Sequence, residues 1–135
     1  MIEVDITETV QFYDTDCGGV VSNIAYLRHV ERARTSLFAT LGMEPAGMME
    51  SGLFPVVIRT EINYRSPARL GDEIRVTARL TAVENVRATC HFRLIASAPG
   101  GESRTVAEAQ QVVALVQMPA GRPTRMPSEW LRLIE

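Results

Sequence analysis

Apolar and polar residues alternate along most of the chain, in segments that predict five β-strands. In the first segment the apolar positions are mostly even-numbered from Ile2 to Phe12, and polar residues fill the odd positions. The same period of two recurs over 54–64, 74–80 and 86–96, and a fifth segment, 105–117, contains the aliphatic run VVALV. Successive side chains of a strand point to opposite faces, so this pattern is typical of strands with one buried face.

One segment breaks the alternation and predicts the longest helix of the chain. Ser22 or Asn23 suits the N-cap, and Gly42 suits the position after the last turn. We therefore expect a helix of about 18 residues, roughly 27 Å long. The segment 45–52 favours a short helical turn or a loop, and 128–134 favours a short helix. Apolar residues of the long helix recur three and four positions apart: Tyr26, Leu27, Val30, Ala33, Leu37, Phe38 and Leu41.

The order of these elements predicts an α+β fold in which one long helix covers a five-stranded antiparallel sheet. Tight turns join the last four strands, and short turns make neighbouring strands antiparallel. The sequence has no internal repeat and no second domain, so we expect residues 1–135 to form one domain. A single helix leaves the edges of such a sheet uncovered, which favours association of chains.

Composition narrows the class of protein. The net charge of −2 argues against a nucleic-acid-binding protein, which carries a basic face. Cys17 and Cys90 form no C-x-x-C pattern, so neither a disulfide framework nor a metal site is expected. The acidic start MIEVDITE differs from a signal peptide, and the longest aliphatic run, Val112 to Val116, is too short to span a bilayer. These features indicate a cytoplasmic protein.

The chemistry of the chain concentrates in a turn just before the long helix. Asp14 and Asp16 precede Gly18 and Gly19, and the helix follows at Asn23. The first N–H groups of a helix lack intrahelical acceptors and carry partial positive charge, so a carboxylate beside them forms a reactive arrangement. Either carboxylate could instead only stabilise the turn or cap the helix. We favour that supporting role for Asp14.

Two longer motifs surround this turn and carry a resemblance to a known family. The chain resembles the hot-dog-fold, 4-hydroxybenzoyl-CoA thioesterase-like family, which includes the acyl-CoA thioesterases associated with the Tol-Pal system. The resemblance spans nearly the whole chain. Its residues are Phe12-x-Asp14-Thr15-Asp16-x-x-Gly19-Val20-Val21, Tyr26 and Glu31-x-Ala33-Arg34, followed by Tyr64-x-Ser66-Pro67-Ala68-x-Leu70-Gly71-Asp72.

The resemblance implies a sheet wrapped around the helix and hydrolysis of an acyl- or aroyl-CoA thioester. Asp16 matches the catalytic aspartate, which attacks the carbonyl or activates a water, and the backbone amide of Asn23 matches the group that polarises the carbonyl. Coenzyme A is then part of the substrate, and no separate cofactor is implied. Such enzymes form homodimers or homotetramers with sites between subunits. The implied substrate-binding positions are Gly19, Val20, Tyr26 and Glu31.

Asn23 departs from the family pattern, because many Tol-Pal-type members carry a histidine there. The backbone amide is retained, but any role of an imidazole is lost. The acyl group therefore stays open, as does the choice between coenzyme A and an acyl carrier protein as its carrier.

Other residues have competing interpretations. Glu31 either pairs with Arg34 or Arg28 on the helix or lines the acyl end of the site, and Tyr26 fits the core better than the acyl pocket. Cys17 has no adjacent histidine and is not expected to be a nucleophile. His29 and His91 are expected on surfaces.

Arginines are expected to meet the phosphates of coenzyme A. The candidates could equally lie on a solvated strand face. We prefer Arg65 and Arg69, which flank the Ser66-Pro67-Ala68 junction. The full set of candidates is Arg59, Arg65, Arg69, Arg87 and Arg93.

Two other functions fit the same fold. A hot-dog hydratase or dehydratase needs a histidine paired with a carboxylate, and neither histidine lies at the turn. A non-catalytic acyl-CoA-binding module needs only the pocket.

Overall fold

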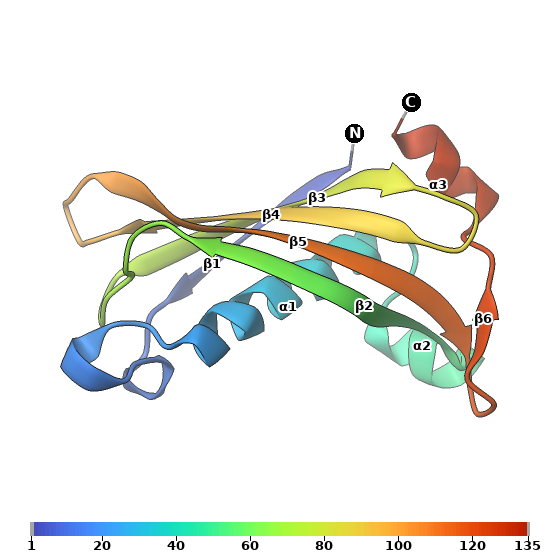
Figure 1. The fold of residues 1–135 in the computed structure, drawn as a ribbon, viewed down its shortest axis with the longest axis horizontal. Coiled ribbons are helices and arrows are strands. Elements are labelled where there is room, and N and C mark those ends of the chain that lie inside the picture. Colours follow the sequence, from blue (N-terminus) through green and yellow to red (C-terminus); the bar gives the residue numbers. More distant parts are fainter. Residues whose placement is uncertain (1, 135) are drawn as a thin grey trace.

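The computed structural model describes residues 2–134 and contains one antiparallel sheet with a long helix on one face (Figure 1). The sheet order is β1-β3-β4-β5-β2, and β6 pairs with the end of β5. The predicted α+β class and antiparallel strands are confirmed. The elements are β1 (Glu3–Thr9), α1 (Asn23–Thr40), α2 (Pro45–Ser51), β2 (Leu53–Tyr64), β3 (Glu73–Val83), β4 (Ala88–Ser97), β5 (Ser103–Gln117), β6 (Arg122–Thr124) and α3 (Ser128–Leu133).

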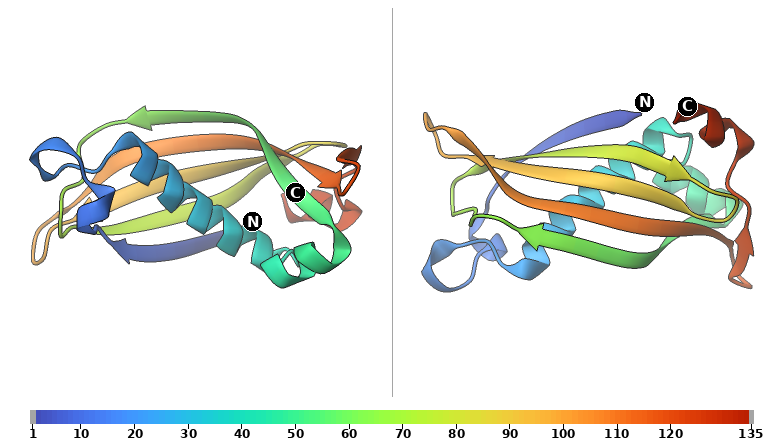
Figure 2. Two further views of the ribbon diagram at one scale, coloured as in Figure 1. Left: turned by 90° about the horizontal axis from the view of Figure 1, so that it is seen from below. Right: turned by 45° about the horizontal axis from the view of Figure 1, so that its top comes forward.

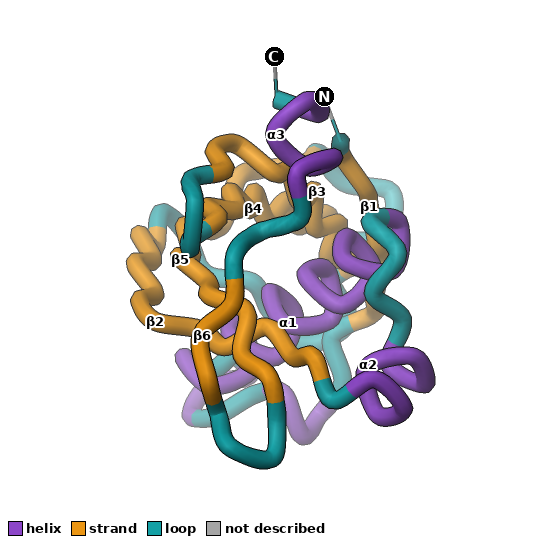
Figure 3. Tube along the Cα trace, turned by 90° about the vertical axis from the view of Figure 1, so that its right-hand side faces the viewer, coloured by secondary structure: helices purple, strands orange, loops and turns teal. Residues whose placement is uncertain are grey.

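The sheet curves around α1, which crosses beneath the strands (Figures 2 and 3). The helix contacts β1, β3 and β4. Val30, Ala33 and Leu37 are fully buried, and they meet a strand face that includes Ile74 and Phe92. The apolar stripe predicted from the sequence is thus the stripe that faces the sheet, and its burial is the main stabilising contact of the fold.

Both ends of α1 follow from side-chain and backbone chemistry. Ser22 is the N-cap, and its Oγ accepts a hydrogen bond from the N–H of Ala25 at 3.2 Å. Between the two predicted caps, the structure therefore selects Ser22. Gly42 lies just beyond the helix with a φ of +89°, a conformation that residues with a Cβ rarely adopt.

The first strand is shorter than predicted. β1 ends at Thr9, whereas the alternation continues to Phe12. The N–H of Val10 donates to the carbonyl of Asp72 at 2.8 Å, and the N–H of Gln11 donates to the Asp14 carboxylate at 2.9 Å. These bonds turn the chain out of the sheet into a 3-10 turn, Phe12–Asp14. Phe12 is consequently 81% exposed instead of buried.

Two further boundaries differ from the prediction. β4 begins at Ala88, two residues later than the predicted segment 86–96, and the turn before it is closed by a hydrogen bond from the N–H of Glu84 to the carbonyl of Arg87 at 2.7 Å. The segment after β5 contains a short strand beyond the five predicted ones, β6, which pairs with Leu115–Gln117.

The far end of α1 is closed by the C-terminal segment. Trp130 of α3 is 1% exposed, and its ring lies 5.6 Å from that of Phe38, measured between centroids. The view in Figure 3 looks onto this end, with α3 and β6 in front of the sheet. The short helices predicted at 45–52 and 128–134 are both present. No helix in the described part of the chain is long and apolar enough to cross a membrane.

Candidate active site

The acidic segment between β1 and α1 forms a loop that closes on itself. Thr15 and Val21 pair as an antiparallel bridge, and the N–H of Asp16 donates to the carbonyl of Val20 at 3.0 Å. Gly18 and Gly19 have φ values of +76° and +74°. Only glycine adopts this left-handed conformation without steric cost, so the two glycines are required for the loop to return to the helix.

The loop lies against the second sequence motif, the junction 66–72. The carbonyl of Gly19 accepts from the N–H of Leu70 at 2.8 Å, and the N–H of Val21 donates to the carbonyl of Ala68 at 2.8 Å. These bonds flank Asp16 on its C-terminal side. The two motifs that carry the family resemblance are therefore in direct contact.

The two aspartates have opposite environments. Asp14 is 5% exposed, its Oδ2 accepts from the N–H of Gln11 at 2.9 Å, and its Oδ1 lies 3.6 Å from Arg28. Its carbonyl also accepts from the N–H of Ser22 at 2.9 Å. Asp16 is exposed, and its carboxylate has no hydrogen bond or ion pair with any residue from 2 to 134. Asp14 stabilises the loop, as predicted, and Asp16 is the carboxylate that is free to react.

The first turn of α1, which follows this loop in the chain, has free hydrogen-bond donors. Ala25 donates its N–H to Ser22, but the N–H groups of Asn23 and Ile24 have no acceptor within the described residues. Free N–H groups at a helix start can stabilise a developing oxyanion. The structure thus brings Asp16 and the amide of Asn23 to the same end of the molecule, where the loop leads into the helix.

Tyr26 occupies the core, beneath the loop. Its hydroxyl oxygen accepts from the N–H of Ala68 at 2.9 Å, and its ring lies 5.4 Å from that of Tyr64. Burial raises the pKa of Tyr26 above its usual value of 10.0. This position fits the core interpretation, and it makes Tyr26 a support for the junction. Val20, by contrast, is partly exposed on the loop.

Glu31 forms the intrahelical pair expected from the sequence, with Arg34 at 3.2 Å. Its carboxyl group is nevertheless mostly exposed. Arg34 also donates to Oε1 of Gln111 at 2.7 Å, and Gln111 donates to Thr60 at 3.1 Å. This polar chain ties α1 to β5 and to the edge strand β2. The sequence gives no signal for it, because Gln111 occupies a position that the strand pattern assigns to apolar residues.

The preferred arginines lie at different distances from the loop. Arg69 is exposed and pairs through its backbone with Val20, so it borders the acidic loop. Arg65 lies at the end of β2 and is paired with Glu108 at 3.5 Å. Of these two arginines, Arg69 is the one whose backbone pairs with the acidic loop.

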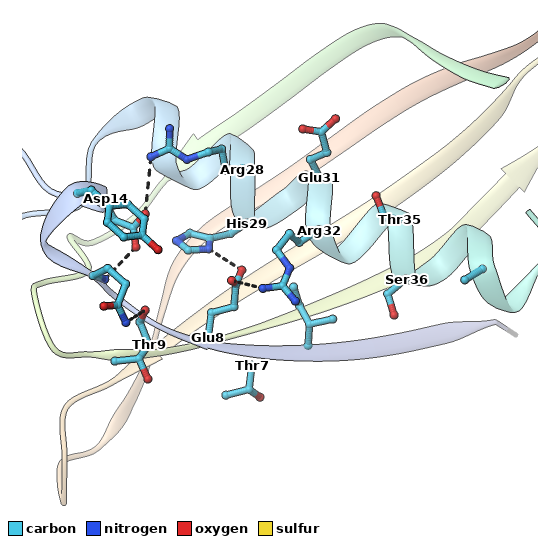
Figure 4. Close-up of a pocket in the computed structure, with 14 residues that line it drawn as sticks. Thr7, Glu8, Thr9, Asp14, Arg28, His29, Glu31, Arg32, Thr35 and Ser36 are labelled. Carbon is cyan, nitrogen blue, oxygen red and sulfur yellow. Dashed lines mark hydrogen bonds and ion pairs between the residues drawn. The ribbon is translucent and has the colours of Figure 1, made fainter. Parts of the chain in front are cut away.

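A groove of about 890 Å³ runs between β1 and α1 (Figure 4). Asp14, Arg28 and Glu31 line it, and Asp16 does not. This groove thus lies beside the acidic loop, on the flank of α1 that faces β1.

His29 lies in the wall of this groove, and its predicted surface position is wrong. It is buried, with Nδ1 2.9 Å from the carboxylate of Glu8, and Arg32 donates to the same carboxylate at 2.6 Å. Glu8 breaks the apolar alternation of the first strand, and its partner on α1 explains why. Nε2 of His29 is buried without a hydrogen-bond partner in the described chain.

The two cysteines have different environments. Cys17 is exposed on the loop, whereas Cys90 is buried in β4, where burial raises the pKa of its thiol to about 12 and argues against a reactive thiolate there. Among residues 2–134, no three His, Cys, Asp or Glu side chains gather as metal ligands.

A loop of this kind before the central helix of a curved sheet agrees with what comparison with known proteins shows. The family model of the thioesterase-like superfamily matches residues 10–134. The chain belongs to this superfamily. The match includes the acidic loop, the long helix and the junction 66–72.

Individual members of the thioesterase-like superfamily resemble the chain over most of its length. Acyl-CoA thioesterase YbgC of Haemophilus influenzae is 30% identical over 121 residues, 89% of this chain and 85% of that protein. The 1,4-dihydroxy-2-naphthoyl-CoA hydrolase of Thermosynechococcus vestitus is 28% identical over 132 residues, 95% and 88% of the two chains. The structure of 4-hydroxybenzoyl-CoA thioesterase from Pseudomonas sp. strain CBS-3 has a TM-score of 0.86 at 17% identity, with 98% and 99% coverage. This last likeness confirms the hot-dog fold.

Proposed function

We propose that the protein hydrolyses the thioester of an acyl- or aroyl-CoA. The observation that carries this proposal is the unpaired carboxylate of Asp16, held on a glycine loop that leads into the free N–H groups of α1. Superfamily membership and the acyl-CoA thioesterases among the relatives support the same reaction.

The chain offers each group that the reaction needs. The carboxylate of Asp16 attacks the thioester carbonyl or removes a proton from an attacking water. The N–H groups of Asn23 and Ile24 donate to the oxygen that becomes negative, and one such donor typically contributes about 3 kcal/mol. The C–S bond then breaks, and coenzyme A leaves as the thiolate or, after protonation, as the thiol. If the carboxylate attacks, a mixed anhydride forms and water cleaves it.

Apolar side chains around the loop are suited to hold the acyl group. Ile24 is 66% exposed, Leu70 50% and Tyr64 47%. Exposed apolar residues gathered at one end of a protein mark a binding surface. We assign Arg69 to the phosphates of coenzyme A, with Arg65 second, because Arg69 borders the loop and has no side-chain partner in the described residues.

The free edge of β2 supports association of two or more copies. Twelve residues of β2, Leu53–Tyr64, have no strand on their outer side within the described chain, and this strand also exposes Val56 and Ile58. An open, apolar edge strand pairs readily with another chain. We propose a homodimer or homotetramer in the cytoplasm, in which the neighbouring copy completes the binding site for the acyl group.

The two alternative functions receive less support. A hydratase needs an accessible base, and the histidine–carboxylate pair near the site, His29 with Glu8, has its second ring nitrogen buried without a partner in the described residues. A non-catalytic acyl-CoA-binding module does not require a carboxylate such as that of Asp16, which has no partner in the described residues.

The test is release of free thiol from short, long and aromatic acyl-CoAs, and from an acyl carrier protein, by the wild type and by Asp16→Asn. We expect turnover by the wild type and a loss of about 10³-fold or more in Asp16→Asn, because the nucleophile or base is removed while the loop backbone is retained. Glu129→Gln is the matched control, since Glu129 is an exposed carboxylate on α3, at the opposite end of the molecule (Figure 1).

Binding of acyl-CoA without turnover on any carrier would contradict the proposal and favour the binding module. Turnover that survives in Asp16→Asn would keep the reaction and exclude this aspartate from it.

A further inference from the structure

We propose that Arg104 and Asp72 form a positioning pair for Asp16. This inference rests on the proposed thioester hydrolysis, but one of its two tests does not depend on activity. Arg104 belongs to β5 and Asp72 to the turn before β3, so the pair joins two segments that lie far apart in the sequence.

The pair closes the turn on which the acidic loop rests. One nitrogen of Arg104 donates to Oδ2 of Asp72 at 2.7 Å and to the carbonyl of Pro67 at 2.9 Å. The same carboxylate oxygen accepts from the N–H of Arg69 at 2.9 Å. The side chain of Asp72 is only 6% exposed, so its charge is balanced mainly by this arginine. Removing the partner of a buried carboxylate strongly destabilises the folded protein.

The junction 66–72 also fixes the position of the acidic loop. Leu70 donates to Gly19, Ala68 accepts from Val21, and Asp72 accepts from Val10, all at 2.8 Å and all through the backbone. Val10, Gly19 and Val21 enclose both sides of Asp16. In the described chain, the backbone hydrogen bonds that join the loop to other segments therefore go to the segment that Arg104 and Asp72 hold.

No side-chain bond within the described residues holds the carboxylate of Asp16 in place if the loop backbone moves. Asp14 is anchored by its carboxylate, whereas the carboxylate of Asp16 has no hydrogen bond or ion pair in the described chain. Its position is set by the backbone of the loop alone. Because a shift of about 1 Å in a reacting group can lower the rate about 100-fold, a pair that fixes this backbone acts on catalysis without touching the substrate.

The kinetic test compares Arg104→Ala, Arg104→Lys and Arg79→Ala. We expect kcat of Arg104→Ala to fall about 10- to 100-fold while KM changes less than about threefold. Lysine retains a charged donor, so Arg104→Lys should keep most of the activity, and added guanidinium should restore part of it in Arg104→Ala. Arg79 is the matched control, because it is a strand arginine of similar exposure, 39% against 35% for Arg104, whose carboxylate neighbour, Glu3 at 3.9 Å, belongs to β1 and not to the turn.

The second test measures the environment of the acidic loop with a spectroscopic label on Cys17. Cys17 is exposed next to Asp16, whereas Cys90 is buried with its pKa raised to about 12, so a fluorine-bearing thiol reagent should label Cys17 alone. We expect the ¹⁹F resonance of labelled Cys17 to shift or broaden in Arg104→Ala, to return towards its wild-type position with guanidinium, and to stay unchanged in Arg79→Ala. If Arg104→Ala does not fold, Arg104→Gln retains a neutral donor and replaces it in both tests.

The outcomes separate this inference from the proposed function. A wild type without turnover removes the proposed function, yet an unchanged Cys17 resonance is still required to overturn the positioning role. A wild type with turnover and an Arg104→Ala variant with unchanged kcat and unchanged resonance overturn the positioning pair alone. A uniform loss of folded protein without a kcat change per folded molecule would also overturn it.

Discussion

The two ends of α1 are built from different interactions. At the C-terminal end, Phe38 packs against Trp130, and both side chains are almost fully buried. At the N-terminal end, the loop 14–22 is held by backbone hydrogen bonds, while Phe12, Ile24 and the carboxylate of Asp16 face solvent. One end is closed by apolar burial, and the other is held in place with its reactive groups exposed.

This difference indicates how a small domain carries an open site. Each side chain of the aromatic pair contributes several kcal/mol, which is a large fraction of the total stability of a domain of this size. The N-terminal end can therefore leave two N–H groups and a carboxylate without partners among residues 2–134. The apolar contacts of the C-terminal end and the proposed site are at opposite ends of the same helix.

The strongest test of this division is Trp130→Ala. Removing a buried tryptophan typically costs about 3–5 kcal/mol, so the midpoint of urea unfolding, followed by circular dichroism, should fall sharply. We expect kcat of the molecules that remain folded, measured well below the midpoint, to stay within about twofold of the wild type. A parallel fall in kcat would show that the two ends are not independent.

Tyr26→Phe, at the N-terminal end of α1, should lower the free energy of unfolding by less than Trp130→Ala does. It leaves the N–H of Ala68 without its acceptor, which we expect to cost about 1–3 kcal/mol. It should also change the dependence of stability on pH. Since burial raises the pKa of Tyr26 above 10.0, its contribution is complete below pH 10 and is lost as pH rises through the folded pKa.

Unfolding free energies measured between pH 9 and 11 should therefore fall less steeply in Tyr26→Phe than in the wild type. Tyr13→Phe is the control, because Tyr13 is 77% exposed. Equal slopes in the two variants would contradict a buried, neutral Tyr26.

Ser22→Ala should give the smallest change in stability. It removes the acceptor of the Ala25 N–H, and loss of an N-cap typically costs about 1 kcal/mol. Because this cap fixes the first turn beside Asp16, we expect kcat to fall more than this loss of stability explains. Ser22→Asp, which restores an acceptor, should recover the stability; a variant in which alanine and aspartate behave alike would argue against the cap.

The sequence predicted the architecture because the fold depends on periodic burial. The alternation over 74–80 and the stripe from Tyr26 to Leu37 mark the faces that meet in the core. The supporting role of Asp14 agrees with its bonds in the loop. The catalytic role of Asp16 came from the family resemblance and stays a prediction, and the lack of a partner for its carboxylate in residues 2–134 is compatible with it.

Other features could not be read from patterns, because they depend on partners far along the chain. Phe12 continues the apolar alternation but lies outside the sheet. The N–H groups of the two preceding residues donate to Asp14 and Asp72 instead of to a neighbouring strand. Arg104 looks like any residue of a solvated strand, and only the tertiary fold brings it to Asp72. His29 looks like a surface residue until Glu8 is placed opposite it.

The aromatic pair at the closed end also makes the protein its own optical probe. Trp130 is the only tryptophan of the sequence, so tryptophan emission reports the environment of that end and of no other part. A red shift that precedes the loss of sheet ellipticity during denaturation would mean that α3 detaches before the sheet melts. Coincident transitions would mean that the C-terminal helix and the sheet unfold as one cooperative unit.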